Sequence, residues 1–172
     1  RDGRPIGRIA ASRNPAFERH WNERTGFFGF FECSETGEKG LETSRALLGK
    51  AKEVLRGWGL SRFQGPASPS SNYGFGTLVE GFDLPPKLMM AYNPPSYDAL
   101  LKGAGLKPCK DLLAFHLDHN QDISRIRRVA SRVAERHSLR VRSVDMKNFW
   151  GEVSLIKEIY NGAWQYNWGF SP

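Results

Sequence analysis

The sequence predicts a mixed α/β domain in which helices cover a sheet. Residues 26–32 (GFFGFFE) form an apolar, aromatic run of strand length, which is typical of a central buried strand. Three longer segments repeat apolar residues at helical spacing, and short strand-like segments separate them. The chain has 172 residues, of which 40% are hydrophobic and 12% aromatic, enough for the core of one domain or of one domain and part of another.

The first part of the chain predicts a hairpin-like pair of strands. Residues 4–12 form the first strand, and residues 26–32 form the second. Residues 14–24 between them are polar and mixed, so we expect a connection there. Gly26 and Gly29 indicate a bulge or a close approach of another backbone segment to the second strand.

The remaining elements follow from the spacing of apolar residues. Residues 41–58 predict an amphipathic helix, and Gly59 stands where a left-handed helix cap belongs. A short strand is expected at residues 61–64. Further along, the pattern predicts helix, strand, helix, strand and helix over residues 94–105, 112–117, 121–137, 138–144 and 147–164.

A long segment, residues 65–97, interrupts these elements. It holds six prolines and four glycines, too many for a long helix or a central strand. It also holds many large apolar and aromatic side chains, which a disordered segment lacks. We therefore expect an ordered functional loop that packs over the sheet.

The charge of the chain favours anionic partners. The net charge is +7 and the isoelectric point is about 9.6. A phosphorylated cofactor, nucleic acid and an acidic membrane surface all fit this charge. Seven arginines lie within residues 124–142, where the simplest interpretation is a solvated helix face. No nucleic acid is expected, because aromatic residues are not interleaved with these arginines, whereas peripheral contact with a membrane surface stays open.

Cysteine usage and hydropathy indicate a cytoplasmic protein. Cys33 and Cys109 have no paired or metal-binding spacing, so two reduced thiols are expected and no metal site. No run of about 18 apolar residues is present. The chain begins at Arg1 without methionine and ends soon after Trp168, so we expect a piece of a longer protein. The pattern does not indicate an oligomeric state.

Several unusual strings then point to a family. These strings are GRPIGRIAAS, GFFGFFE, RGWGL, MM-x-YNPP-x-Y and NWGF. They resemble a bacterial group within the GNAT acyltransferase superfamily, whose members consist of two GNAT-like halves. The resemblance implies a mixed, mostly antiparallel sheet flanked by helices, here incomplete. It also implies a first half at residues 1–118, a linker helix at residues 119–138, and the first strand and helix of a second half at residues 139–172. A further possibility is that the strand at residues 139–144 fills the sheet edge left by the missing first strand.

The resemblance implies an acyl-CoA-dependent N-acyltransferase that acts on an amine, including lipid-type amines in some relatives. The co-substrate is acyl-CoA or acetyl-CoA, whose pyrophosphate such proteins hold on a glycine-rich loop and a helix N-terminus. Here Lys39 and Gly40 provide a partial anion site, but Glu42 and Ser44 replace the expected glycines. We therefore expect the missing second half to bind most of the cofactor and the isolated chain to be inactive. The alternative is a non-catalytic half with a degenerate CoA site.

The long loop holds the candidate catalytic and substrate-binding residues. Glu80, between apolar residues, is the candidate general base, and Tyr92 is the second catalytic candidate. Four more polar residues are candidates for substrate binding, namely Ser70, Asn72, Asn93 and Tyr97. For Glu80 a solvent-facing structural role stays open, and for Ser70 and Asn72 a role in turns.

Overall fold

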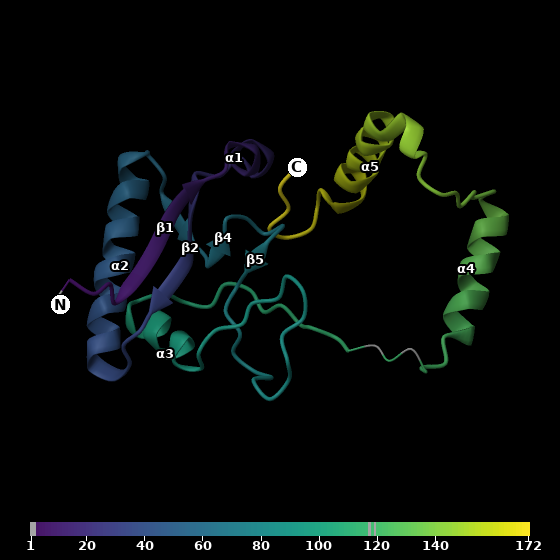
Figure 1. Ribbon diagram of the computed structural model, residues 1–172. Coiled ribbons are helices and arrows are strands. Elements are labelled where there is room, and N and C mark those ends of the chain that lie inside the picture. Colours follow the sequence, from purple (N-terminus) through teal and green to yellow (C-terminus); the bar gives the residue numbers. More distant parts are fainter. Residues whose placement is uncertain (1–2, 117, 119) are drawn as a thin grey trace. The chain divides into compact units, whose positions relative to one another are not determined.

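The computed structural model describes residues 3–116, 118 and 120–172 (Figure 1). The chain forms two compact units. The first consists of Arg1–Asp111 with Trp164–Pro172, and the second consists of Leu112–Ala163.

The first unit is built on a three-stranded sheet with the order β1-β2-β3. Strand β1 (Gly7–Arg13) pairs antiparallel with β2 (Thr25–Cys33), as predicted for the hairpin-like pair. Helix α2 (Gly37–Gly57) then returns the chain to β3 (Arg62–Gln64), which pairs parallel with β2. Gly59 has the predicted left-handed conformation, with φ +75°. The mixed α/β fold expected from the sequence is confirmed.

A bulge at Phe30 decides which side chains of β2 face α2. The register between β1 and β2 shifts between Arg8 and Ala10, and Phe30 has a φ of 49°. Side chains alternate between the two faces of a strand, and one extra residue reverses that alternation. Phe28 and Phe31, three residues apart, therefore lie in the same core cluster.

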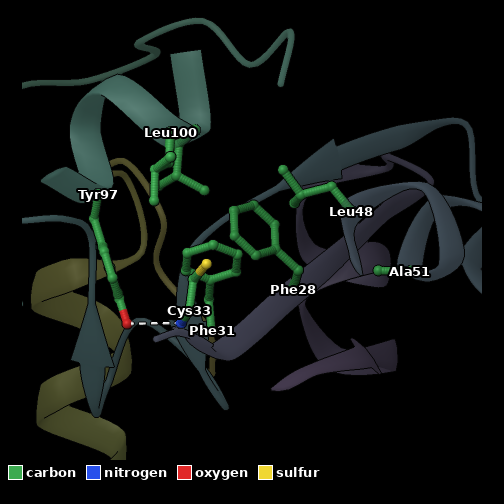
Figure 2. Close-up of a cluster of buried hydrophobic side chains, with 8 residues drawn as sticks. Phe28, Phe31, Cys33, Leu48, Ala51, Tyr97 and Leu100 are labelled. Carbon is green, nitrogen blue, oxygen red and sulfur yellow. Dashed lines mark hydrogen bonds between the residues drawn. The ribbon is translucent and has the colours of Figure 1, made fainter. Parts of the chain in front are cut away.

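That cluster fills the space between the sheet and helices α2 and α3 (Ser96–Gly103) (Figure 2). Its fully buried members include Phe28 and Leu48, at 0% and 1% exposure. Burying a side chain of this size contributes about 1.5–3 kcal/mol. This cluster therefore fixes α2 and α3 on the β2 strand.

The opposite face of β2 carries a second cluster. Its buried members are Phe17, Phe27 and Ala67. Ala67 belongs to a two-residue strand, β4 (Ala67–Ser68), which pairs with β5 (Gly74–Phe75). A side chain at Gly29 would run into the carbonyl group of Ala67, so glycine is required where the two backbones meet. The close backbone approach predicted at Gly29 is confirmed.

Residues 14–24 connect the two strands as expected, but they contain a helix that was not predicted. Helix α1 (Pro15–Trp21) begins at Asn14, whose Oδ1 accepts hydrogen bonds from the amides of Ala16 and Phe17. Pro15 suits the first turn, and Asn22 ends the helix in the left-handed conformation. The helix was not predicted because one buried residue, Phe17, leaves no periodic pattern to detect.

The end of the chain lies against α1. The indole Nε1 of Trp21 donates to the carbonyl of Phe170 at 2.9 Å, and Asn14 Nδ2 donates to Ser171 Oγ at 2.8 Å. Phe170 is buried. The last residues of the chain are therefore part of the first unit, although α5 separates them from it in sequence.

The second unit contains helix α4 (Ser124–Arg136), a short 3-10 helix at Met146–Asn148 and most of helix α5 (Phe149–Trp164). The helices predicted near these positions are confirmed. The strands predicted at residues 112–117 and 138–144 are wrong for every residue that the structure describes, and residue 117 lies outside that part. Alternating apolar residues form a strand only where another strand completes their backbone hydrogen bonds, and none does so here. Residues 139–144 form no strand, and neither described sheet includes them, so the possibility that they fill the sheet edge is not borne out in the described residues. Among the described helices, none combines the length and the apolar character that crossing a bilayer requires.

Candidate functional site

The side chain of Asn93 closes the long loop at its base. Its Oδ1 accepts the amide hydrogen of Leu78 at 2.7 Å, and its Nδ2 donates to the carbonyl of Leu78 at 3.2 Å. Nδ2 also donates to the carbonyl of Pro94 at 3.0 Å. One side chain thus satisfies both backbone groups of a residue that is distant in sequence. Residues 78–93, here called the clamped loop, form a closed surface loop.

The middle of the clamped loop does not pack on the sheet, contrary to expectation. Leu88 is 92% exposed, and the other large apolar side chains of the loop with substantial exposure are Val79, Leu84, Met89, Met90 and Tyr92. Only the flanks of the long segment reach the core, through Ala67 on one side and Tyr97 on the other. Aromatic and aliphatic content predicted burial, but the prolines and glycines leave no regular element to carry these side chains inward.

The two candidate catalytic residues lie at the two ends of the clamped loop. Glu80 follows Leu78 by two residues, and Tyr92 precedes Asn93. Both side chains are exposed, so the apolar surroundings expected for Glu80 are not present. No hydrogen bond between them is found in the described part of the chain. Their catalytic roles, like substrate binding by Asn93, remain predictions.

Ser70 and Asn72 lie at a turn beside β4. The Oγ of Ser70 accepts the amide hydrogen of Asn72 at 3.3 Å, which is the turn role kept open for this pair. Ser70 also lines a cavity of about 10 Å³ together with Phe75 and the end of the chain at Gly169. A cavity of this size holds about one water molecule. Glu80, Tyr92 and Asn93 do not line it.

Tyr97 links α3 to the end of β2 through its hydroxyl group. The hydroxyl accepts the amide hydrogen of Cys33 at 3.0 Å (Figure 2). It also donates to Glu32 Oε2 at 3.0 Å. Glu32 also accepts from Arg8 at 3.3 Å. Burial raises the pKa of Tyr97, and the hydrogen bond to Glu32 adds to this while that from Cys33 opposes it. The hydroxyl predicted to bind substrate is engaged in the fold.

In the first turn of α2, the amide of Gly40 is already engaged in the helix. The amide of Gly40 donates to the carbonyl of Thr36 at 3.1 Å. A side chain at Gly40 would meet the backbone of Glu35, so this residue is covered as well as buried. Lys39 is exposed, but Glu38 lies beside it in the same turn and opposes an anion. The partial anion site predicted at Lys39 and Gly40 therefore has no amide of Gly40 to use.

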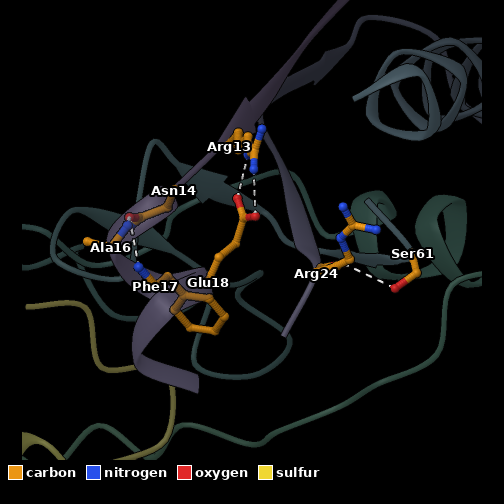
Figure 3. A network of polar contacts seen from close by, with 7 residues as sticks. All are labelled: Arg13, Asn14, Ala16, Phe17, Glu18, Arg24 and Ser61. Carbon is orange, nitrogen blue, oxygen red and sulfur yellow. Dashed lines mark hydrogen bonds and ion pairs between the residues drawn. The ribbon is translucent and has the colours of Figure 1, made fainter. Parts of the chain in front are cut away.

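A groove beside α1 was not foreseen, because residues 14–24 were expected only to connect two strands. It has a volume of about 280 Å³, and charged residues of both signs line it, namely Arg13, Glu18, Arg19, Glu23 and Arg24. Arg13 donates to both carboxylate oxygens of Glu18, at 2.7 and 3.0 Å, which raises the pKa of Arg13 (Figure 3). The signal available in the sequence was Asn14-Pro15, a helix start. Because the charges of the groove largely compensate, it does not select an anion.

Two curated proteins are similar to the chain. Protein YghO of Escherichia coli (strain K12) is 31% identical over 173 residues, which cover 99% of this chain and 43% of that protein. Bacterial ceramide synthase of Caulobacter vibrioides is 31% identical over 173 residues, which cover 100% of this chain and 44% of that protein. The chain thus spans less than half the length of either relative. No family model and no solved structure matches it, so the GNAT resemblance stays a prediction.

Proposed function

We propose that the intact protein is an acyl-CoA-dependent N-acyltransferase that transfers an acyl group to an amine of lipid type. The observation that supports this most is the similarity to bacterial ceramide synthase along 100% of the chain. A ceramide carries its acyl group on an amine nitrogen, so forming one is an acyl transfer to an amine. The net charge of +7 agrees with a phosphorylated co-substrate.

For this part of the protein, we propose that it binds the acceptor and not the CoA phosphates. Strands β2 and β3 pair only over Thr25–Phe27 and Arg62–Gln64, and the chain turns away at Gly65. Strand β4 covers β2 beyond that point, where the amide of Phe30 donates to Ser68 Oγ at 2.9 Å. The backbone along this part of β2 therefore already has a partner, and the amide of Gly40 at the start of α2 is bonded within the helix. The CoA phosphates are therefore proposed to bind outside residues 1–172.

The clamped loop is the proposed wall of the acceptor site. Its exposed apolar side chains suit a long hydrocarbon chain, and methionines adapt to irregular apolar surfaces. Glu80 is the proposed base that takes a proton from the attacking amine, and Tyr92 is the proposed acid that protonates the departing CoA thiolate. In the competing proposal, this part of the protein is a non-catalytic half. The edge of β2 that β4 covers favours this proposal, because its backbone already has a partner.

Mass spectrometry of the reaction products distinguishes these functions. The protein extended to the length of its relatives is mixed with a long-chain acyl-CoA and a long-chain amino alcohol, and the amide product is measured. We expect product from the extended protein and none from residues 1–172. Glu80→Gln should lower the rate, whereas the matched variant Asp83→Asn on the same loop should not.

Each possible outcome bears on one of the two functions. If the extended protein binds no acyl-CoA in calorimetry and forms no amide, the acyltransferase proposal fails. If it forms amide and both Glu80→Gln and Tyr92→Phe react at the parental rate, the acyltransferase stands and this part is non-catalytic.

A further inference from the structure

Helix α4 has an apolar stripe that no residue of its own unit buries. Ile126, Val129 and Val133 recur at spacings of three and four, so they lie on one face of the helix. They are 69%, 54% and 45% exposed, and no residue of α4 is buried. An amphipathic helix ordinarily turns such a stripe toward a core. Within the second unit, this stripe therefore has no core to face.

The charges of α4 are arranged around this stripe. The helix holds five arginines and one glutamate, Glu135. At 100° per residue, Arg125 and Arg136 lie within about 40° of Val129, at one border of the stripe. On the other side Ala130 and Ala134 extend the apolar face, and Arg127 lies beyond them, about 100° from Ile126. Glu135 falls on the opposite face. Among the described residues, no ion pair involves an arginine of α4.

We propose that α4 lies flat in the interface of a bilayer that contains anionic phospholipids. The aliphatic stripe would face the acyl chains, and the arginines at both borders would reach the lipid phosphates while their alkyl stems stay in the apolar layer. An anionic lipid complements both features together. Nucleic acid would pair with the arginines but would leave the stripe in water, and a protein groove over the stripe would have to accommodate arginines at both borders.

A carboxylate binds the first turn of α4. Asp122 Oδ1 accepts the amide hydrogen of Ser124 at 2.8 Å, and this hydrogen bond lowers the pKa of Asp122. A carboxylate at this end also interacts favourably with the helix dipole. The N-terminal turn of α4 is therefore stabilised by a residue next to it in the sequence.

Sedimentation with lipid vesicles tests this proposal without acyl donor or amine, so its outcome is independent of the proposed function. The extended protein and residues 1–172 are both mixed with vesicles of phosphatidylcholine alone or with 30% phosphatidylglycerol. We expect binding to the anionic vesicles only, weakening as salt is raised. Hydrogen exchange should show new protection at residues 123–137 when the anionic vesicles are present.

Variants separate the stripe from the charge. The double variant Arg125→Gln/Arg127→Gln should bind about 30-fold more weakly, from about fivefold for each arginine near an anionic surface. The matched control Arg19→Gln/Arg56→Gln removes the same charge from exposed positions of α1 and α2 and should bind like the parent.

The stripe itself is tested by the uncharged double variant Ile126→Ser/Val129→Ser. We expect it to bind roughly tenfold or more weakly, with its helix content confirmed by circular dichroism.

Four results would overturn the proposal. The first is parental binding by the serine variant, which would mean adsorption by charge alone. The second is equal weakening by the control pair. The third is binding to a 20-residue DNA duplex that is tighter than binding to the anionic vesicles. The fourth is full protection of residues 123–137 in the extended protein without vesicles, which would place the stripe on another part of the same protein.

Discussion

Replacing Gly29 with alanine tests the contact between β2 and β4. The new Cβ would meet the carbonyl group of Ala67, which is backbone and cannot rotate away. Overpacking of this kind costs about 1–3 kcal/mol. Displacing β4 would also break the hydrogen bond from the Phe30 amide to Ser68 Oγ, which adds about 0.5–1.5 kcal/mol. We expect the free energy of unfolding to fall by roughly 2–4 kcal/mol.

Gly49→Ala is the matched control. Gly49 lies in the interior of α2, is exposed, and a Cβ there meets no atom within 4 Å. Alanine should raise the free energy of unfolding by about 0.5–1 kcal/mol, because glycine is a poor helix former. Urea unfolding followed by tryptophan fluorescence measures both. A loss of 3 kcal/mol lowers the midpoint by about 1.5 M for a slope of about 2 kcal/mol/M. Urea midpoints that change in the same direction for Gly29→Ala and Gly49→Ala would refute the contact between β2 and β4.

Three further predictions follow from the hydrogen bonds. Tyr97→Phe should destabilise the first unit by about 1–3 kcal/mol, because it leaves the buried amide of Cys33 without an acceptor. Equal urea midpoints for Tyr97→Phe and the parent would exclude this destabilisation. Because the pKa of the Tyr97 hydroxyl is raised in the folded protein, its contribution to the free energy of unfolding is complete below about pH 10. That contribution is lost as the pH rises through the pKa of the folded state. In Tyr97→Phe the free energy of unfolding should not show this fall, and urea unfolding at about pH 8 to 11 measures it. Asn93→Ala should speed tryptic cleavage at Lys87 several-fold, because both hydrogen bonds to Leu78 are lost. Asn93→Asp keeps the acceptor, so its cleavage rate should lie between those of the parent and Asn93→Ala. Cleavage of both variants at the parental rate would contradict the clamp.

The sequence predicts the centre of the first unit well because its signals are long. The aromatic run of β2 and the periodicity of α2 each extend over many residues, so tertiary context did not override them. Helix α1 is short and buries only Phe17, so it leaves no period, although Asn14-Pro15 marks its start. Residues 138–144 alternate like a strand, but alternation describes a face and does not supply a neighbouring strand.

The candidate site is less predictable because its contacts join distant segments. The pairing of Tyr97 with Glu32 depends on how α3 packs at the end of β2, and neither residue indicates the other in sequence. The same holds for Asn93 and Leu78. The apolar character of the clamped loop predicted burial, whereas the structure exposes it, because hydrophobicity alone does not say whether a side chain faces the core or a ligand.

The most direct test of the account is whether the intact protein joins a long-chain acyl group to the nitrogen of a lipid amine. The protein extended to the length of its relatives is incubated with isotope-labelled acyl-CoA and a long-chain amino alcohol, and labelled amide is sought by mass spectrometry. We predict labelled amide that requires both substrates. Labelled fatty acid and free CoA without any amide would contradict the account, because acyl transfer to water would then be the reaction.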